Sequence, residues 1–443
     1  MTINQLQGKL GCRLIEEDFY RLFAQELRKS VEKLPARKKP EQWAMTAYLR
    51  EWHAFNQASD PDDCVVSCDG SIAESVFSGG LEAWVGRAVA HIRPKQGSMT
   101  SLPSVEVPVG YELGGKSIFL KTIELETLSR AIERATENHA KVFAVYDGNL
   151  SLFLPARYLQ RLQPLADLFE RHVKAIIKCF KLTQQGRVEL VGVSKDSNVT
   201  YLRARLTLDA LLQADPEVGE AMRRGQRSLR LMARRLTEII EHDGKSSLRP
   251  YLNELGQPIS DEALYGELDT GPGYTAPLLL APQTRFFALE AEKGTNDWWD
   301  SSFRRLLERN SALEGLRVAL DDLYSLPPVA ISYWKPRHGP ATFRIDIPSN
   351  LLGQESKTGD MKENVLAEDI GSDRTQGLVS KLNWLSQGEN IVSPLTEVDA
   401  IARLDRRLYH SSYEPLIIKE LASKGHTVRL SKRRIRDYVL RGY

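Results

Sequence analysis

The chain has 443 residues, of which 42% are hydrophobic and 27% are charged, and its formal net charge is +2. These values are typical of a soluble globular protein that is long enough to bury a large core. No apolar run approaches the length of a membrane span, and Met1–Cys12 lacks the basic and apolar regions of a signal peptide. We therefore expect a cytoplasmic protein without a membrane segment.

The cysteines are predicted to be reduced thiols in the core. They form no C-x-x-C pair, and none stands at zinc-ribbon spacing from histidines. Free cysteine behaves as a small hydrophobic residue, so we expect no metal role for them. The cysteines are Cys12, Cys64, Cys68 and Cys179.

Residues 1–60 are predicted to form a helical extension. Two helices are expected, Glu17–Leu34 and Pro40–Asn56, and the second carries aromatic residues at mostly helical spacing. This aromatic face is more typical of a core or a dimer contact than of a ligand site. The Asp-rich segment Gln57–Asp63 is expected to be a loop that leads into the first strand.

Two short apolar runs each end in an Asp-Gly pair. Cys64–Cys68 is followed by Asp69-Gly70-Ser71, and Val142–Tyr146 is followed by Asp147-Gly148. Asp-Gly after a strand is a common turn signal, because Asp bonds its own backbone and Gly permits positive φ. The two pairs together favour another interpretation, in which two buried strands present carboxylates from their ends.

Between these aspartates the pattern predicts strands and then a helix. Ala83–Ile92 and Lys116–Ile123 are expected to be strands, joined by a connection rich in Gly and Pro, and Glu124–His139 is expected to be a helix. The order is a strand with Asp, further strands, a helix and a second strand with Asp. This is the beginning of a ribonuclease H-like fold, in which the helix supplies a third carboxylate.

Three glutamates of this helix compete for the third position. Glu126 is the preferred candidate, because an acid in the predicted first turn also suits the helix dipole. Glu124 and Glu133 are the alternatives, and Glu133 is expected to lie further from the strand ends.

Neighbouring buried carboxylates require compensation by a positive charge, since each raises the penalty of burying the other. Mn²⁺ and Mg²⁺ are hard cations that take oxygen ligands, and water and substrate phosphates can complete their shell. Phosphodiester hydrolysis is the chemistry that most often uses such a site. The sequence therefore predicts a metal-dependent phosphodiesterase.

The remainder of the chain is predicted to be a mixture of helices and strands. Glu217–His242 is expected to be one long helix with a stripe of arginines, for which a solvated face is a commoner explanation than contact with nucleic acid. The stripe consists of Arg223, Arg227, Arg230 and Arg234. The polar segment 243–277, rich in Gly and Pro, is expected to be an insertion or a flexible loop. The other expected elements are the helices Tyr158–Phe180 and Pro415–Lys424 and the strands Val188–Val193, Phe286–Ala291, Val329–Lys335 and Thr342–Ile347.

The last segment of the chain carries a strong local charge. From Lys424 to Tyr443 there are seven basic residues and one acid, Asp437, which give a local net charge of +6. A basic patch of this kind is expected to meet a phosphate-bearing partner or an acidic protein surface. A solvated terminus is the alternative.

Several segments, taken in order, resemble the NurA nuclease family, whose members pair with the hexameric HerA translocase. The resemblance extends from about Cys64 to Ala422 and depends on the order of the segments more than on any one of them. The segments are Val65–Ser71, Phe143–Leu150, Leu190–Ser197, Ile331–Pro348 and, more weakly, Tyr413–Glu420.

The resemblance implies a ribonuclease H-like mixed α/β core with flanking helices, a homodimer, and Mn²⁺- or Mg²⁺-dependent DNA cleavage coupled to a HerA-type ATPase in DNA end processing or phage defence. Asp69 and Asp147 match the metal-binding aspartates of the family, and Glu126 is chosen as the helix glutamate. The implied domains are a helical extension over 1–60, a NurA-type nuclease domain over 61–425 with an insertion at about 243–277, and a basic tail over 426–443.

The segment that begins at Tyr413 departs from the family. Family members continue from Tyr-Pro to an Ala-His pair, whereas this chain has Lys419-Glu420 at that place. Glu420 is therefore the candidate for the last catalytic group, either as a further metal ligand or, alternatively, as a solvated helix residue.

Basic residues near the predicted strand ends are candidates for contact with DNA. Lys195 is expected to stabilise the scissile phosphate as a point charge, and Lys335, Arg344 and Tyr413 are expected to hold the nucleic acid. Ion pairs with acids such as Asp196 and Asp346 are the alternative for these cations. A non-catalytic adaptor that loads a motor ATPase onto DNA is the rival function, and a nucleotidyl transferase or integrase lacks an identifiable substrate domain.

Overall fold

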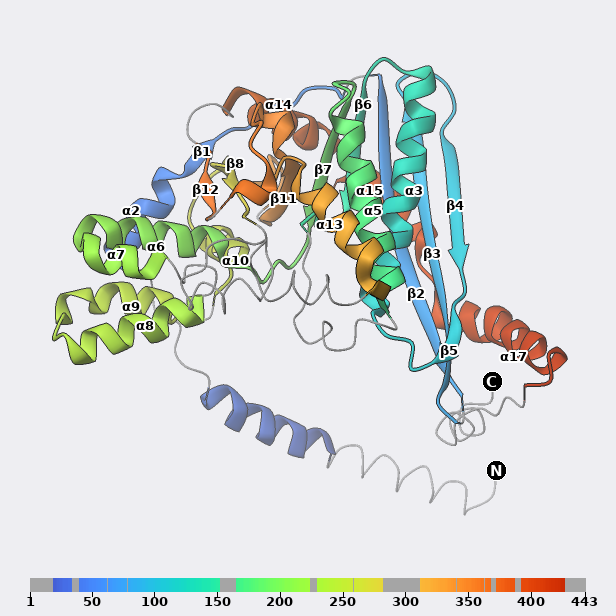
Figure 1. Cartoon of the computed structure of the whole chain (residues 1–443), viewed down its shortest axis with the longest axis horizontal. Coiled ribbons are helices and arrows are strands. Elements are labelled where there is room, and N and C mark those ends of the chain that lie inside the picture. Colours follow the sequence, from blue (N-terminus) through green and yellow to red (C-terminus); the bar gives the residue numbers. More distant parts are fainter. Residues whose placement is uncertain are drawn as a thin grey trace. The chain divides into compact units, whose positions relative to one another are not determined.

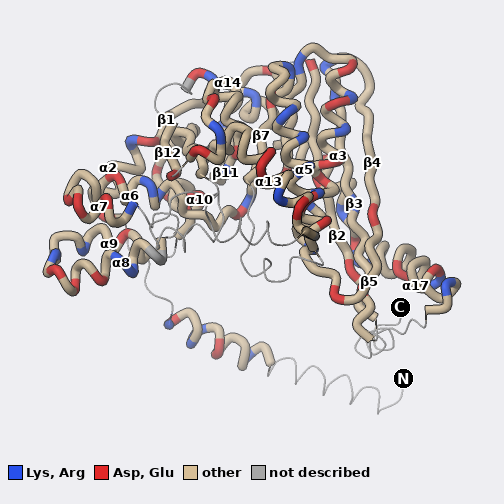
Figure 2. The backbone as a smooth tube through the Cα atoms, viewed as in Figure 1, with Lys and Arg blue, Asp and Glu red and all other residues tan. Residues whose placement is uncertain are grey.

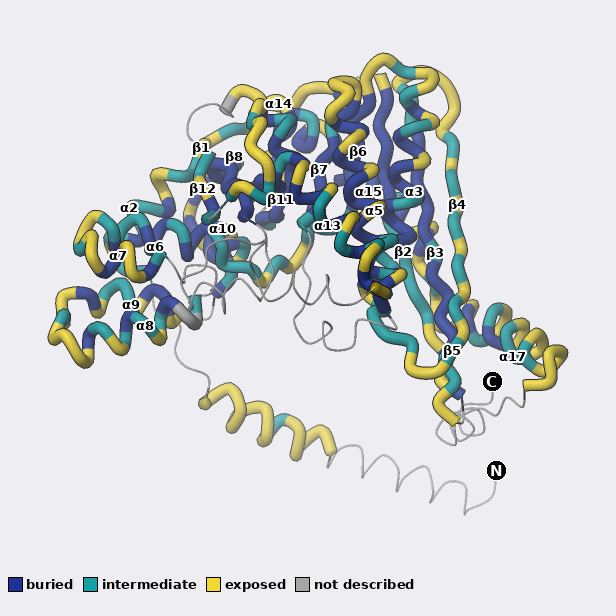
Figure 3. Tube along the Cα trace, viewed as in Figure 1, coloured by how far each residue is buried: buried dark blue, intermediate teal, exposed yellow. Residues whose placement is uncertain are grey.

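The structure is a computed structural model, and it describes residues 19–33, 40–61, 63–77, 79–151, 165–223, 229–257, 259–281, 311–339, 341–361, 363–367, 372–386 and 392–426. The chain divides into two compact units, Met1–Glu41 and Gln42–Tyr443. The described part of the first unit is a helix over residues 19–32 whose residues are almost all exposed (Figure 3). In the described part of the chain, no helix is both long enough and apolar enough to span a membrane.

The second unit is built on one 12-stranded sheet of described strands (Figure 1). The main path of hydrogen-bonded neighbours has the order β1-β8-β10-β11-β7-β6-β2-β3-β4, while β5 pairs with β3, and β9 pairs with β10 and β12. The strands are β1 (Trp52–Ala54), β2 (Cys64–Val76), β3 (Leu81–Pro94), β4 (Thr100–Glu106), β5 (Val109–Tyr111), β6 (Val142–Asp147), β7 (Val188–Ser194), β8 (Gly273–Thr275), β9 (Leu278–Leu279), β10 (Val329–Lys335), β11 (Phe343–Pro348) and β12 (Val365–Leu366).

Parallel pairing is confined, among the described strands, to the centre of the sheet, where β6 pairs with β2 and with β7. The other strand pairs are antiparallel. A parallel connection needs a crossover, and a helix usually provides it. Here α3 (Lys116–Asn138) precedes β6 and α5 (Ala166–Thr183) precedes β7, so both crossovers contain a helix. The result is a mixed α/β protein, as the sequence predicts.

Helices cover both faces of the sheet centre. On one face α3, α5 and α13 (Glu314–Tyr324) bury a core with Val66 and Tyr146, and on the other α14 (Ser372–Leu385) and α15 (Ser393–Ala402) bury a core with Val65 and Val145 (Figure 1). Because strand side chains alternate between faces, β2 and β6 are apolar on both, and Figure 3 shows their central parts buried.

A separate helical group has its own core, which contains Leu208, Met222, Met232 and Leu236. Its helices are α6 (Tyr201–Ala214), α7 (Pro216–Arg223), α8 (Leu229–His242) and α9 (Arg249–Leu255). The predicted single helix over Glu217–His242 is wrong, because Arg235 Nη1 donates to Ala221 O at 3.3 Å. In one straight helix these residues would lie about 21 Å apart along the axis, so Arg223 and Arg234 do not share a stripe.

Two predicted elements take a different form. The expected strand Lys116–Ile123 is the first part of α3, since Phe119 and Ile123 pack against Trp84 and Ala88 at helical spacing. The expected helix Pro40–Asn56 ends early, because α2 (Gln42–Arg50) is followed by β1, which pairs with β8. Short apolar runs do not distinguish a strand from a buried helix by periodicity alone.

The segment 243–277, expected to be an insertion or flexible loop, contains α9, α10 (Asp261–Glu267) and β8. Asp261 is fully buried, and its carboxylate accepts hydrogen bonds from Leu202 N at 2.9 Å, Arg203 N at 3.2 Å and Tyr333 OH at 2.9 Å. This carboxylate therefore joins the start of α6 to β10. The Gly and Pro content misled the prediction because tertiary contacts order the segment.

Most other predicted elements are confirmed with shifted ends. The confirmed set comprises β3, β6, β7, β10, β11, α5 over its described part and α17 (Glu414–Ser423). The predicted strand Phe286–Ala291, Cys12 and most of the basic tail lie outside the described residues. Over the described elements, acidic and basic residues are interspersed (Figure 2). The remaining short elements are η2 (Ser246–Leu248), η3 (Ser311–Leu313), η4 (Ser349–Leu352), η5 (Thr358–Asp360), α16 (Arg406–Leu408) and the π-helix η6 (Tyr409–Tyr413).

Replacing Asp261→Ala is expected to lower the free energy of unfolding by about 2–4 kcal/mol, because the start of α6 loses its carboxylate acceptor and the Tyr333 hydroxyl loses its partner. Urea unfolding followed by circular dichroism measures the change. The control is Asp269→Ala, an exposed aspartate of the same segment, for which a change within about 0.5 kcal/mol is expected. Equal effects of the two variants would contradict the buried contacts of Asp261.

Candidate active site

Asp69 and Asp147 lie side by side on neighbouring strands. The last parallel pair of β2 and β6 is Cys68 with Tyr146, and each aspartate is the next residue of its strand. Adjacent strands are about 4.8 Å apart, so the two aspartates start from neighbouring backbone positions. Alternation from Val65 and Val145 directs both side chains to the face covered by α14 and α15.

The two Asp-Gly pairs have different backbone roles. Gly148 has φ 151° and its N–H donates to Val193 O at 2.9 Å, so the second pair ends β6 as a turn signal does. Asp69 and Gly70 instead lie within β2, which continues to Val76 beside β3. The prediction that Asp69 stands at a strand end is therefore wrong for β2 itself, and it is β6 that ends there.

The environment of Asp69 disfavours its negative charge. Burial raises the pKa of Asp69 to about 7, and repulsion from Asp147 and Asp399 adds to the rise, while the Gly70 N–H and Lys195 oppose it. Gly70 N donates to Asp69 Oδ1 at 2.7 Å. The Asp69 carboxylate therefore lies in a region where negative charge is only partly compensated.

Glu124 approaches β2 from α3, on the face of the sheet opposite to the Asp69 and Asp147 side chains. Its side chain is only 4% exposed, and Tyr146 OH donates to Glu124 Oε2 at 2.7 Å. Burial raises the pKa of Glu124 to about 8, and repulsion from Asp69 and Asp147 contributes, although the Tyr146 hydrogen bond and Lys121 oppose the rise. The three carboxylates thus act on one another electrostatically.

Gly70 is required by the approach of Glu124. A Cβ atom at this position would lie 2.8 Å from Glu124 Oε1 and 2.7 Å from Arg87 O. Both distances are shorter than van der Waals contact. The glycine of the Asp-Gly-Ser triplet therefore makes room for a helix carboxylate rather than for a turn.

Glu126 and Glu133 point elsewhere. Glu126 Oε1 accepts from Arg171 Nε at 2.6 Å, and Arg171 on α5 also binds Glu106 of β4. Glu133 pairs with Lys178 of α5 at 2.8 Å. Two residues of helix turn the side chain by about 200°, so Glu124 and Glu126 cannot both face β2. The packing of α3 on β2 and β3, seen at Phe119 and Ile123, brings Glu124 to the strand.

Lys195 binds Asp147 directly. Its Nζ lies 2.7 Å from Asp147 Oδ2, and it also opposes the negative charge of Asp69. The predicted alternative of an ion pair is therefore correct in kind, although the partner is Asp147 and not Asp196. Lys195 stands at the end of β7, next to β6, which explains the pairing.

Asp399 is a carboxylate that the sequence did not single out. It lies on α15 and raises the pKa of Asp69. The end of α15 is held beside Asp69 by Ser71 Oγ, which donates to Ala402 O, and by Arg87 Nη2, which donates to Ile401 O at 3.1 Å. Pro394 marks the start of a helix in the sequence, but no sequence signal connects this helix with β2.

Arg344 forms a buried ion pair and not a surface one. Its side chain is 2% exposed, and its Nε lies 2.7 Å from Asp346 Oδ1. Asp346 Oδ2 also accepts from Leu150 N at 3.0 Å and from Ser151 N at 3.2 Å. The pair therefore fixes the segment that follows Asp147, and this positions the end of β6.

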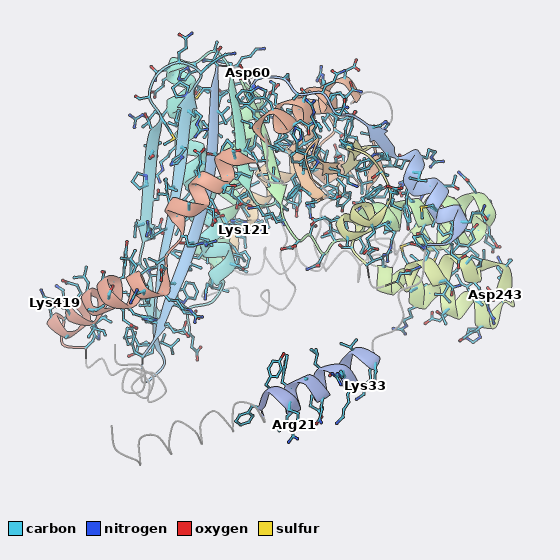
Figure 4. The ribbon with its side chains drawn as sticks, turned by 180° about the vertical axis from the view of Figure 1, so that it is seen from behind. Arg21, Lys33, Asp60, Lys121, Asp243 and Lys419 are labelled. Carbon is cyan, nitrogen blue, oxygen red and sulfur yellow. The ribbon has the colours of Figure 1, made fainter. Side chains whose placement is uncertain are left out.

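Three other predicted residues are not brought to Asp69. Lys335 Nζ donates to Thr270 O at 2.7 Å, where β10 borders β8. Tyr413 stacks on Tyr409, with ring centroids 6.5 Å apart, and Glu420 is exposed on α17. Figure 4 labels its neighbour Lys419 at one end of the described unit and Lys121 nearer to its middle.

The anchor of α17 explains this separation. Its buried acid is Glu414, which accepts from Ser75 Oγ at 2.7 Å and lies 2.8 Å from His410 Nδ1. Ser75 is six residues beyond Asp69 on β2, a distance of about 20 Å along a strand. Glu420, a further turn and a half along the helix, is therefore remote from the aspartates.

A cleft with a volume of about 350 Å³ opens beside Asp147. Its wall includes three cationic side chains, Lys121, Lys195 and Arg344. Lys121 projects from α3 (Figure 4), and its Nζ donates to Asn149 Oδ1 at 2.7 Å. A cleft with this lining suits an anionic ligand. The other lining residues are Asp147, Gly148, Asn149, Ser194, Asp196, Ser197, Asn198 and Val199.

The carboxylates have the chemistry of a site for a hard cation, but they are not assembled into one. Among the described residues, no three carboxylate, imidazole or thiolate groups are arranged to hold a metal ion. Glu124 is hydrogen-bonded to Tyr146, and Asp147 is paired with Lys195. Their oxygen donors fit Mn²⁺ or Mg²⁺, and the raised pKa values of Asp69 and Glu124 indicate that compensating positive charge is incomplete.

One further phosphate-binding spacing occurs away from this site. The segment from Gly110 to Ser117 matches G-x-x-x-x-G-K-[ST]. In the structure it joins the three-residue strand β5 to α3, and Lys116 Nζ binds Glu74 at 2.8 Å. Because the lysine is paired with a carboxylate and the preceding strand is short, we assign no nucleotide site to it.

The fold and the site define a mixed α/β protein whose carboxylates gather where a parallel strand ends. A family model for the NurA domain matches residues 16–367, and the chain belongs to the NurA family. The crystal structure of the NurA nuclease from Sulfolobus solfataricus is similar, with 12% sequence identity and a TM-score of 0.44 over 96% of this chain and 98% of that one. A structure of NurA with manganese is similar at 13% identity and a TM-score of 0.38, over 90% of this chain and 96% of that one. The comparison with curated proteins gave no match.

Gly70→Ala is expected to destabilise the protein by about 1–3 kcal/mol, the usual effect of forcing atoms into a filled site. The loss should be smaller when Glu124→Ala is already present, because two of the three closest atoms then disappear. A double-mutant cycle from urea unfolding measures this coupling. Purely additive effects would contradict the contact between Gly70 and Glu124.

Asp69→Asn is expected to raise the melting temperature of the metal-free protein near pH 8.5 and to raise it less near pH 5. The folded pKa of Asp69 is about 7 against an ordinary value of 3.8, so its contribution to stability is complete below pH 3.8 and is lost as the pH rises through the folded pKa. Thermal unfolding in EDTA at both pH values measures the difference. The exposed Asp269→Asn is the control, and a lower melting temperature of Asp69→Asn at high pH would contradict the expectation.

Proposed function

We propose that the chain is a metal-dependent deoxyribonuclease that hydrolyses DNA phosphodiester bonds, with Asp69, Glu124 and Asp147 as its essential carboxylates. The observation that carries the proposal is the shared electrostatic region of these three groups, two on adjoining strands and one on α3. Carboxylates with perturbed pKa values are typical of functional sites, and Asp147, which repels both Asp69 and Glu124, lines a cationic cleft. Membership of the NurA family supports the same chemistry.

Glu124 replaces Glu126 in this proposal. The carboxylate of Glu126 is engaged by Arg171, whereas Glu124 is buried above Gly70 and repelled by both aspartates. A metal ligand needs a position from which it can meet the other ligands. Of the described glutamates of α3, Glu124 is the one that lies against Gly70, next to Asp69, and is repelled by both aspartates.

Asp69, Glu124 and Asp147 would hold Mn²⁺ or Mg²⁺, and Asp399 is a candidate fourth carboxylate. A bound divalent cation polarises the phosphate and neutralises charge that develops on the leaving oxygen. Carboxylate oxygens suit both metals, and another NurA protein has been solved with manganese. Tyr146 orients Glu124 through its hydroxyl, and this hydrogen bond favours the charged form that a metal requires.

Lys195 would stabilise the phosphate as a point charge, because it stands at the cleft and next to Asp147. Arg344 has a different role, since its guanidinium is committed to Asp346 and holds the segment after β6. Lys335, Tyr413 and Glu420 are left out of the catalytic group on the basis of their contacts elsewhere.

The core is proposed to be ribonuclease H-like. Support comes from the antiparallel series β2, β3 and β4, followed by α3 and then by β6, which pairs in parallel with β2. In such a core the acids come from the first strand, the crossover helix and the next parallel strand. Asp69, Glu124 and Asp147 occupy these three positions.

The partners are proposed from the family resemblance. They are DNA, a HerA-type hexameric ATPase and a second copy of the chain, and the setting is DNA end processing or phage defence. The basic tail from residue 426 onward suits an acidic protein surface or DNA. Copurification of the chain with a neighbouring ATPase of this type, lost when the tail is deleted, tests the pairing.

One observation favours the adaptor function. Among the described residues, no three His, Cys, Asp or Glu side chains are arranged to hold a metal ion. Such an adaptor would bind DNA and a motor ATPase without cleaving. The nuclease proposal accounts for more of the structure. DNA binding alone does not require carboxylates that repel one another, whereas a metal-dependent nuclease does. The cleavage assay below distinguishes the two functions.

Glu124→Gln, Asp69→Asn and Asp147→Asn are each expected to lower the rate of Mn²⁺-dependent DNA cleavage at least about 100-fold, because a metal site contributes several kcal/mol to the transition state. Glu126→Gln is the matched control on the same helix and should stay within about threefold, since a metal-remote ion pair contributes little. Cleavage of a labelled oligonucleotide measures these rates. A wild-type protein that binds DNA without cleaving it would favour the adaptor.

A further inference from the structure

The three cations of the cleft differ in how their charge is balanced. Lys195 lies 2.7 Å from a carboxylate oxygen of Asp147, and the Arg344 guanidinium makes two hydrogen bonds to Asp346, at 2.7 Å and 2.9 Å. Both are therefore neutralised by an acid. Lys121 differs, because its Nζ donates to the amide oxygen of Asn149, which carries no charge.

The ammonium group of Lys121 keeps donors for a ligand. It has three N–H bonds, and Asn149 accepts one of them. Across the described residues, no carboxylate oxygen lies within ion-pair distance of Lys121 Nζ. Glu124 and Asp346 act on Lys121 only as nearby charges. Lys121 is thus the lining cation whose charge is available to an anion that enters the cleft.

Lys121 lies close to the carboxylates in both the helix and the sheet. It precedes Glu124 by three residues on α3, so the two side chains lie on the same side of the helix. Asn149, its acceptor, follows Asp147 by two residues, and Asp346 fixes the next two amides, Leu150 N and Ser151 N. The amine is therefore held between α3 and the end of β6 by ordered groups.

We propose that Lys121 is a phosphate-binding residue of the cleft and that Asn149 holds its amine in place for the backbone of a nucleic acid. The proposal rests on the proposed nuclease function and specifies where its substrate is held. A half-buried ammonium attracts an anion more strongly than an exposed lysine, since the local dielectric is lower. Lys195 and Arg344 would first have to release Asp147 and Asp346 before either could bind a phosphate.

The test measures DNA binding by the full-length protein in metal-free buffer, where Lys195 keeps Asp147 as its partner. Fluorescence anisotropy with a short single-stranded oligonucleotide gives Kd over a series of salt concentrations. Lys121→Met should weaken binding about tenfold and reduce the slope of log K against log salt by about 0.7, the change expected for one phosphate contact. Lys121→Arg should restore most of the affinity.

Two further variants make the result independent of folding. Lys174→Met removes an exposed lysine that pairs with Glu170 on α5, and it should change neither Kd nor the slope. Asn149→Asp keeps the shape of the side chain but offers the amine a carboxylate, so it should weaken binding as much as Lys121→Met does. In the double variant the two losses should not add.

Equal Kd values and slopes for Lys121→Met and Lys174→Met would overturn the proposal. Unchanged binding by Asn149→Asp would also overturn it. Cleavage is measured separately with Mn²⁺, where Lys121→Met should raise KM more than it lowers kcat. A wild-type protein that fails to cleave would overturn the nuclease function, whereas an active wild type with an unaltered KM in Lys121→Met would overturn only the role of Lys121.

Discussion

Repulsion between carboxylates held in a partly buried region is the constraint on which the central structure depends. Asp69 and Asp147 leave a parallel pair of strands side by side, and Glu124 approaches β2 from α3 on the opposite face, above Gly70. Each group raises the cost of ionising its neighbours. The surrounding polar contacts limit this cost, since Lys195 binds Asp147 and Tyr146 binds Glu124. A divalent cation would remove the repulsion that these contacts leave, which connects the stability of the apo protein with its proposed function.

The supports of this region come from distant parts of the chain. Asp346 on β11 accepts the amides that follow β6, and Arg344 neutralises it. The end of α15 is bonded to β2 and β3 and brings Asp399 near Asp69. A buried pair such as Arg344 and Asp346 contributes little net stability by itself, but the loss of one partner would leave a buried charge. The arrangement therefore specifies geometry more than it adds to the free energy of folding.

The cleft and the carboxylates are expected to bind two different ligands. The acids attract a cation, and the cationic wall attracts a phosphate, so each alone would repel the ligand of the other. Lys121 and Lys195 connect the two sets, because both oppose the negative charge of an acid and both line the cleft. In this protein the pairing of each lysine decides its role. Lys195 is bound to an acid of the proposed metal set, while Lys121 is bound to a neutral amide.

The sequence by itself determined the two strands with their aspartates, the second part of the crossover helix between them and the strands β10 and β11, because apolar periodicity and turn residues are local signals. It left Glu124, Glu126 and Glu133 as alternatives, since the choice depends on which face of α3 packs against β2. It could not identify Asp399 or the ordered segment 243–277, and it offered Glu420 for a position that α17 does not reach. These features were decided by tertiary contacts between residues far apart in the chain, such as Ser71 with Ala402 and Asp261 with Tyr333. Local sequence patterns do not show which distant residues come into contact, and only the folded sheet determines which side chains meet.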